Sequence, residues 1–348
     1  MKAASNAILA LSRSFYGKRL TNADFDALLH CSSVNEAAQY LTLKTPYADA
    51  IVESGVSSFT ARFLEELVSK HRFSTFVKLC RYEMAIGNAF YRYFIMRDEV
   101  DQIERATLLL LGGNTDIYLQ RVNSFLDKHL SIDLFALGRA NSLEEIAASL
   151  ERTAYGDLYR ACLDAPKVDY LTFEQTLEAH FSKEVRNLCK ACFSAKERET
   201  LLDLICRSQD CRLIERVWRS KRFYRSVPDL YADLDAHDVP LTLLSDKILR
   251  QLAACETESD VIRVLEKSPY RGWLDPTGEQ SVEFRLEKQL YELCRKEIRF
   301  SSYPGVVMYC YLLLSAVETK NLLRVIEGVK FRVPAQVIEK NLILEPTK

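Results

Sequence analysis

The sequence predicts an all-α fold made of three similar helical repeats, and three observations support this prediction. The 348 residues include only 11 glycines and 9 prolines, few for a β-rich protein that needs many turns. Apolar residues recur at helical spacing, whereas strict alternation of apolar and polar residues, the pattern of half-buried strands, is hard to find. A short motif also occurs three times along the chain. Repetition at this scale predicts one structural unit used three times.

Each copy of the motif has a Ser or Thr, an acidic residue three positions later, a leucine, and a basic–hydroxyl–Pro/Ala–Tyr ending. The Ser or Thr is expected to cap a helix of about three turns, and the acid to complete a capping box. Pro46 and Pro269 would end that helix, because proline disfavours helical geometry at the preceding residue. The signature residues are Ser33, Glu36 and Tyr47, then Ser142, Glu145 and Tyr155, then Thr257, Asp260 and Tyr270.

The spacing of the three copies divides the chain into near-equal thirds. The motif tyrosines lie 108 and 115 residues apart, and a long helical stretch follows each copy. Two of these stretches end alike, in residues 221–228 and 329–334, whereas the first ends in Leu111-Gly112-Gly113. The predicted repeats are residues 1–120, 121–232 and 233–348.

The long stretch of the first repeat predicts an amphipathic helix. From Tyr93, apolar residues such as Val100 and Ile103 keep one face apolar. On the other face Arg97 and Asp101 are four residues apart and can form an ion pair.

Composition restricts the class of function. Lys and Arg total 47 against 48 acidic residues, for a net charge of −1, which argues against a protein whose main task is to neutralise nucleic-acid phosphates. The uncharged run 300–317 has 18 residues and its apolar part, residues 306–317, has 12, both short of the roughly 20 that cross a bilayer. Residues 1–10 read as the start of a helix and not as a secretory signal. A soluble cytosolic protein is expected.

Two clusters could carry chemistry, and each has a simpler interpretation. Cys189 and Cys192, with Cys206 and Cys211 downstream, loosely resemble a zinc site, but the second pair is separated by four residues and the connecting sequence looks helical. Buried free thiols are favoured. The Arg212–Arg225 stretch interleaves basic and aromatic residues as single-strand-binding surfaces do. The C-terminal end of a helix with a protein-binding surface is favoured.

Catalytic and nucleotide-binding patterns are not found. The five histidines are far apart, and there is no glycine-rich phosphate loop, no HExxH and no G-x-S-x-G. We therefore expect no cofactor, no metal and no active site.

The repeated residues also carry a family resemblance. The segments that carry it are Asn6-Ala7, Ser12-Arg13-Ser14, residues 20–29, Thr45-Pro46-Tyr47, Glu99-Val100-Asp101, residues 302–307, residues 318–322 and Ile326-Glu327-Gly328. In order and spacing, these segments resemble the central-stalk C-type component of V/A-type rotary ATPases (ATP synthases), a family that includes the d-type component of eukaryotic vacuolar pumps. The resemblance covers nearly the whole chain.

The resemblance implies a funnel of three similar helical domains around a pseudo-threefold axis. One face would rest on the membrane rotor ring of proteolipid subunits, and the socket would receive the foot of the D/F shaft. The protein would be present once per complex, peripheral to the cytoplasmic side of the membrane, and would transmit torque without chemistry of its own.

For the socket we expect the polar faces of the long helices. The candidate shaft contacts are Arg97 and Asp101, Arg207 and Arg212, and Glu318, Asn321 and Arg324. The alternative is that these residues form intrahelical pairs or bridge neighbouring domains. Alternative functions are a helical-repeat scaffold that binds proteins, an RNA-binding protein that uses Arg212–Arg225, and an α-helical metalloenzyme.

Overall fold

The all-α prediction is confirmed. The structure is a computed structural model that describes residues 2–122, 124–223, 241–274 and 280–346, and these contain helices and no β-strand. The helices are α1 (Lys2–Gly17), α2 (Asn22–Leu29), α3 (Val34–Lys44), α4 (Ala48–Val52), α5 (Ala61–Ala85), α6 (Arg92–Leu111), α7 (Asp116–Arg121), η1 (Ser124–His129), α8 (Leu134–Arg139), α9 (Leu143–Leu150), α10 (Gly156–Leu163), α11 (Tyr170–Cys192), α12 (Ala195–Phe223), α13 (Asp246–Ala253), α14 (Glu258–Leu265), α15 (Val282–Phe300), α16 (Pro304–Lys330) and α17 (Ala335–Glu339).

The chain forms two compact units, which are described separately below. Unit 1 contains Met1–Asn88, Ala195–Ser226 and Leu243–Lys348. Unit 2 contains Ala89–Ser194 and Val227–Thr242. Both ends of the chain therefore belong to the same unit.

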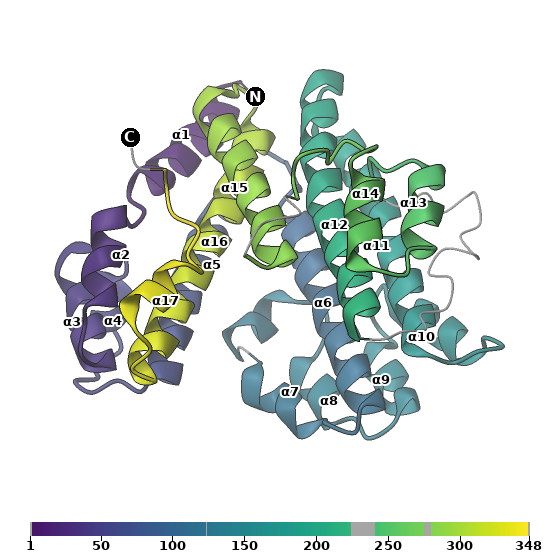
Figure 1. Cartoon of the computed structure of the whole chain (residues 1–348), viewed down its shortest axis with the longest axis horizontal. Helices are drawn as coiled ribbons and strands as arrows, with labels where there is room; N and C mark the ends of the chain where they lie inside the picture. Colours follow the sequence, from purple (N-terminus) through teal and green to yellow (C-terminus); the bar gives the residue numbers. More distant parts are fainter. Residues whose placement is uncertain (1, 123, 224–240, 275–279, 347–348) are drawn as a thin grey trace. The chain divides into compact units, whose positions relative to one another are not determined.

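Within these units the helices pack as three modules, each with two long helices and a set of short helices. Module B, in unit 2, pairs α6 with α11 and includes α8, α9 and α10. Module C, in unit 1, pairs α12 with α15 and includes α13 and α14. Module A, also in unit 1, pairs α16 with α5 and includes α2, α3 and α4 (Figure 1). Module A is therefore assembled from opposite ends of the sequence.

The modules begin at other residues than the predicted repeats 1–120, 121–232 and 233–348, and those repeat ranges stay predictions. Modules B and C begin at Arg92 and Ala195, and the first long helix of module A begins at Pro304. The long helix that ends each sequence repeat packs with the short helices of the next repeat, and α16 packs with those of the first. The pseudo-threefold symmetry and the funnel shape stay predictions.

Hydroxyl and carboxylate caps start the second long helix of every module. Thr60 accepts a hydrogen bond from the Phe63 amide at the start of α5, Asp169 from the Thr172 amide in α11, and Ser281 from the Phe284 amide in α15. Each cap satisfies a backbone donor that has no partner inside its helix, and removing such a cap typically costs about 1 kcal/mol.

Helix α16 is the apolar centre of module A. Leu322 and Ile326 on α16 share a buried cluster with Leu28, Leu41 and Leu64 from α2, α3 and α5. Burying each such side chain contributes about 1.5–3 kcal/mol. By length and hydropathy alone α16 could cross a membrane, but 67% of its most apolar stretch is buried inside the protein. This burial is typical of the core helix of a folded domain.

The two ends of the chain pack on α16 of module A, and the N-terminal helix α1 also reaches α15 of module C. The Arg13 side chain on α1 donates hydrogen bonds to the carbonyls of Ile298 and Ser301, at 2.8 and 2.7 Å, and so caps the end of α15. Residues 341–346, the C-terminal strap, run back along α16. The buried amide of Asn321 donates to the Ile343 carbonyl at 2.8 Å and accepts from the Ile343 amide at 3.2 Å.

Helices α6 and α16 end with the same backbone geometry. Gly113 and Arg332, each two residues beyond its helix, have φ of 67° and 53° in the left-handed region. The residues before them donate to carbonyls of the last turn, Gly112 to Leu108 and Phe331 to Glu327. Glycine adopts this conformation freely, whereas arginine is strained there. The first repeat ends in Gly112-Gly113 and not in the basic–aromatic sequence of the third, but the backbone conformation at the two helix ends is the same.

Candidate functional site

The repeated motif builds a short capped helix in each module, as predicted. Ser33, Ser142 and Thr257 accept hydrogen bonds from the amides three residues later, at the starts of α3, α9 and α14. Of the three motif copies, the one with Thr257 and Asp260 forms the complete capping box. Glu36 and Glu145 accept instead from the amides of Ser32 and Asn141, one residue before the cap. Helix α3 has 11 residues, whereas α9 and α14 have 8, shorter than predicted.

The hydroxyl residue of the motif closes each capped helix. Thr45, Thr153 and Ser268 donate to carbonyls of the last turn, at 2.5 to 2.7 Å, and accept from the amide of the motif tyrosine, at 3.1 to 3.3 Å. These paired bonds fix the backbone that enters each motif tyrosine, so the tyrosine side chain has a defined direction.

In module A the motif tyrosine binds a carboxylate on α16. The buried Tyr47 donates its hydroxyl proton to Glu318 Oε1 at 2.6 Å, and the other oxygen, Oε2, accepts from the Leu20 amide at 3.1 Å. Leu20 stands shortly before α2. One carboxylate thus joins the long helix to the segment before α2 and to the segment after α3.

Module B repeats this arrangement with different residues. Tyr155 donates to Glu99 Oε2 on α6 at 2.7 Å, and Glu99 Oε1 accepts from the Ser131 amide at 2.6 Å. Ser131 stands two residues before Asp133, the cap of α8. Tyr155 and Glu99 are 2% and 4% exposed, so water does not replace either bond.

Module C repeats it again. Tyr270 donates to Asp210 Oδ2 on α12 at 2.5 Å, and the same oxygen accepts from the Leu243 amide at 2.9 Å. Leu243 stands two residues before Ser245, which precedes α13. We call the three arrangements the tyrosine–carboxylate clasps.

Electrostatics indicate that the clasps are structural. Burial, followed by the charge of the neighbouring carboxylate, raises the pKa of Tyr47, Tyr155 and Tyr270 well above the usual tyrosine range. The hydroxyls therefore stay protonated as hydrogen-bond donors. Burial also raises the pKa of Glu318 to about 7, against the opposing hydrogen bonds from Tyr47 and Leu20. The arrangement braces helices and offers no activated nucleophile.

Sequence reasoning missed Glu99 and Asp210 as partners of the motif tyrosines, and selected Glu318 for a different role. The sequence contains a signal for these pairs: an acidic residue precedes the motif tyrosine at nearly the same spacing, 56 residues for Glu99 and 60 for Asp210. Tyr47 does not follow this spacing, because its partner Glu318 lies 271 residues after it in the chain.

The predicted shaft contacts on α6 point into module B. Arg97 is 8% exposed, and its guanidinium pairs with Asp101 and with Glu178 of α11, both at 2.8 Å. The face expected to be polar and open is covered by α11. The intrahelical and bridging alternative therefore describes Arg97 and Asp101 in this structure.

Carboxylates outnumber cations around Arg97. Glu104, which is also buried, lies 3.9 Å from the guanidinium. Burial and the charge of Glu178, opposed by Arg97, raise the pKa of Glu104 to about 8. Glu104 therefore carries a proton at neutral pH.

The other predicted shaft contacts differ in accessibility. Arg207 pairs with Asp203 one turn away, at 2.8 Å, and its guanidinium lies 5.9 Å from the Trp273 ring. Arg212 is half-buried on α12. These two residues were expected in a common socket with those of α6, and the structure assigns the two sets to different units.

On α16 the three predicted contacts have internal partners. Glu318 belongs to the module A clasp, and Asn321, 2% exposed, holds the C-terminal strap. Arg324 is half-exposed and donates to the Asn341 carbonyl at 3.0 Å. Asn321 has no surface left for a shaft, whereas Arg324 does.

The alternative sites gain no support among the described residues. No group of three or more His, Cys, Asp or Glu side chains is placed to hold a metal in that part of the chain. In the Arg212–Arg225 stretch, Arg219 pairs with Glu215 and Glu283, and Trp218 packs against the module C core. Residues 224 and 225 lie outside the described residues.

Comparison with known proteins agrees with the sequence resemblance. The family model described as ATP synthase (C/AC39) subunit matches residues 8–341. No curated protein matched the chain. Because the match covers nearly the whole sequence and the fold is helical as the resemblance implies, this protein belongs to the ATP synthase (C/AC39) family of V/A-type ATPase components.

Proposed function

We propose that this protein is the central-stalk rotor component of a V/A-type ATPase or ATP synthase. In this role it connects the D/F shaft of the catalytic head to the proteolipid ring, on the cytoplasmic side of the membrane and in a single copy. It transmits torque between ATP turnover and ion translocation and has no active site of its own. The family match over residues 8–341 carries the proposal.

The clasps support a torque-bearing role. A coupling protein must resist shear between its helices, and each clasp ties a long helix to two backbone segments through a buried carboxylate. Hydrogen bonds to a charged group contribute about 1.5–3 kcal/mol each. Tyr47 and Tyr270 also belong to buried apolar clusters, and such close packing gives low compressibility.

Reconstitution of the complex tests the proposal. Without this chain, the catalytic head with its shaft should hydrolyse ATP while the ring in vesicles moves no ions, and adding the chain should restore ATP-driven ion transport. Ion transport that is equally fast without the chain would refute a coupling role.

Two of the predicted shaft contacts remain our candidates, Arg324 and Arg212, because both are partly accessible, whereas Arg207, equally accessible, is held by Asp203 at 2.8 Å. Charge reversal at either residue should weaken shaft binding at low salt, measured by co-purification with D/F. Arg97 is unsuitable for this test, because reversing a buried charge destabilises module B.

A further inference from the structure

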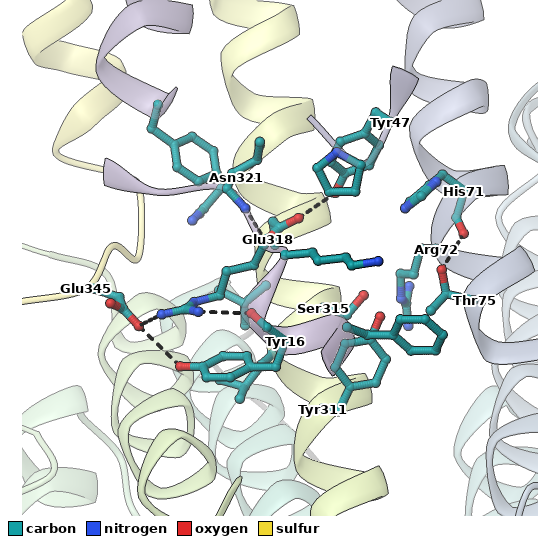
Figure 2. A pocket seen from close by; sticks show the side chains of 18 of the residues that line it. Tyr16, Tyr47, His71, Arg72, Thr75, Tyr311, Ser315, Glu318, Asn321 and Glu345 are labelled. Atoms are coloured by element: carbon teal, nitrogen blue, oxygen red, sulfur yellow. Dashed lines mark hydrogen bonds and ion pairs between the residues drawn. The ribbon is translucent and has the colours of Figure 1, made fainter. Parts of the chain in front are cut away.

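A cavity of about 220 Å³ opens beside the module A clasp. Its walls are the end of α1, the middle of α5, one face of α16 and the C-terminal strap. Figure 2 shows His71, Arg72 and Thr75 on one wall, with Tyr311 and Ser315 of α16 beside them. All of these residues belong to unit 1. The cavity is thus a feature of one compact body.

Positive charge prevails on the cavity wall. Lys18, Arg72 and Lys78 are exposed side chains that line its mouth and form no ion pair with any described residue. Arg19 also lines it, but Glu345 neutralises this arginine at 2.5 Å. Three cations without a carboxylate partner in one cavity make it attractive to an anion.

Hydrogen-bond donors accompany these cations. Burial raises the pKa of Tyr311, so its hydroxyl remains a donor inside the cavity. The hydroxyl of Ser315 lines the same wall, whereas the Thr75 hydroxyl there already donates to the His71 carbonyl at 3.1 Å. Arg72 is close enough to Tyr47 and Tyr311 to lower the pKa of both through its charge.

Apart from the paired Glu345, the acidic residues of the lining reduce this charge but are fewer than the three cations. Asp49 and Glu318 also line the cavity. Both oxygens of Glu318 already accept hydrogen bonds, from Tyr47 and from the Leu20 amide. Its pKa of about 7 means that it is partly neutral at neutral pH.

Modules A and B differ in the residue that follows the histidine packed on the clasp tyrosine. His71 packs on Tyr47 with ring centroids 4.6 Å apart, and His180 packs on Tyr155 at 5.8 Å, so the two histidines occupy matching positions. The next residue is Arg72 in module A and Phe181 in module B. Phe181 is 1% exposed and packs against the Tyr93 ring, with the Arg97 guanidinium 4.6 Å from its own ring centroid. In module A the residue after the histidine is the exposed Arg72, whose charged side chain lines the cavity.

We propose that this cavity binds a phosphate group, presented by inorganic phosphate or a small phosphomonoester, with Arg72 as the main contact and Lys18 and Lys78 as charge partners. A guanidinium fits the geometry of a phosphate better than an ammonium does, because its planar fork donates two parallel bonds. The volume is below the roughly 300–1,000 Å³ of pockets for drug-sized ligands, so the bound molecule must be small.

Calorimetric titration of the full chain with inorganic phosphate, glycerol phosphate and acetate tests this inference. Phosphate and glycerol phosphate should bind at least tenfold more tightly than acetate. Arg72→Gln should weaken phosphate binding at least tenfold, and Lys78→Gln severalfold. Arg81→Gln is the matched control, since Arg81 is exposed on the same helix but does not line the cavity, and it should change the affinity less than twofold.

A further measurement distinguishes a soluble phosphate from a lipid headgroup. Flotation with vesicles that contain phosphatidic acid, compared with phosphatidylcholine vesicles, detects a headgroup phosphate, and Arg72→Gln should abolish that binding too. The inference is overturned if no phosphate probe binds, if acetate binds as well as phosphate, or if Arg72→Gln and Arg81→Gln behave alike.

Discussion

Replacing Tyr155 by Phe isolates the energy of one clasp. The substitution keeps the ring, which is 2% exposed, and removes only the hydroxyl that donates to Glu99 at 2.7 Å. A buried bond to a charged acceptor contributes about 1.5–3 kcal/mol, and the variant leaves a carboxylate oxygen without its donor. We therefore expect the unfolding free energy of unit 2 to fall by about 2 kcal/mol.

Two measurements check this expectation. Urea denaturation followed by far-UV circular dichroism gives the change in unfolding free energy. Hydrogen exchange followed by mass spectrometry gives the protection of the Ser131 amide, which donates to the other oxygen of Glu99 and should exchange faster in the variant. The control is Tyr82→Phe, since Tyr82 is 47% exposed and such surface changes stay within about 0.5 kcal/mol.

The reasoning fails if Tyr155→Phe behaves like Tyr82→Phe in both measurements. Tyr47→Phe and Tyr270→Phe extend the test to modules A and C, where the same bond has lengths of 2.6 and 2.5 Å. Comparable costs at all three positions are expected if the clasps are equivalent. A large effect in one module alone would contradict their equivalence.

Three further predictions concern strain, protonation and the strap. Arg332→Gly should stabilise the protein by about 0.5–1 kcal/mol, because it removes the strain of a left-handed arginine, whereas Gly113→Ala should destabilise it by about 1 kcal/mol. Urea denaturation measures both changes in unfolding free energy, and changes of the same sign would refute this reasoning. Glu104 has a folded pKa of about 8, above its unfolded value, so its contribution to stability is complete below about pH 4.5 and is lost as the pH rises through 8. In Glu104→Gln the unfolding free energy should fall less as the pH rises, so the variant should be more stable than the wild type at pH 8.5. The same pH dependence of the unfolding free energy in both proteins would contradict this prediction. Asn321→Ala removes both amide bonds to Ile343 and should cost about 2–3 kcal/mol, with faster proteolysis of the C-terminal residues, whereas the exposed Asn341→Ala should have little effect.

Local chemistry explains what the sequence could predict. The caps at Ser33, Ser142 and Thr257 depend on residues three positions apart, and each of them forms. The pairing of Arg97 with Asp101 is local in the same way, and it forms at 2.8 Å. Patterns within one turn of helix are therefore readable from the sequence.

Non-local packing explains what the sequence could not predict. The face of α6 that carries Arg97 looks polar in sequence, and only the packing of α11 shows that Glu178 covers it. The clasp partner of Tyr47 lies at the other end of the chain, because module A takes α16 as its long helix. The cavity beside it depends on α1, α5, α16 and the strap together, and no local pattern signals their convergence.

The divided origin of module A has a consequence for biosynthesis. Helices α2 to α5 have left the ribosome well before α16 is made, since α5 ends at residue 85 and α16 at residue 330. At about 5–20 residues per second, this delay is roughly 10 to 50 s. During it, Phe25, Leu41 and Leu64 lack the apolar partner that later buries them, so the nascent N-terminal segment needs protection from aggregation. Module B, whose helices end at Cys192, can close first, and the N-terminal helices must wait for the last part of the chain.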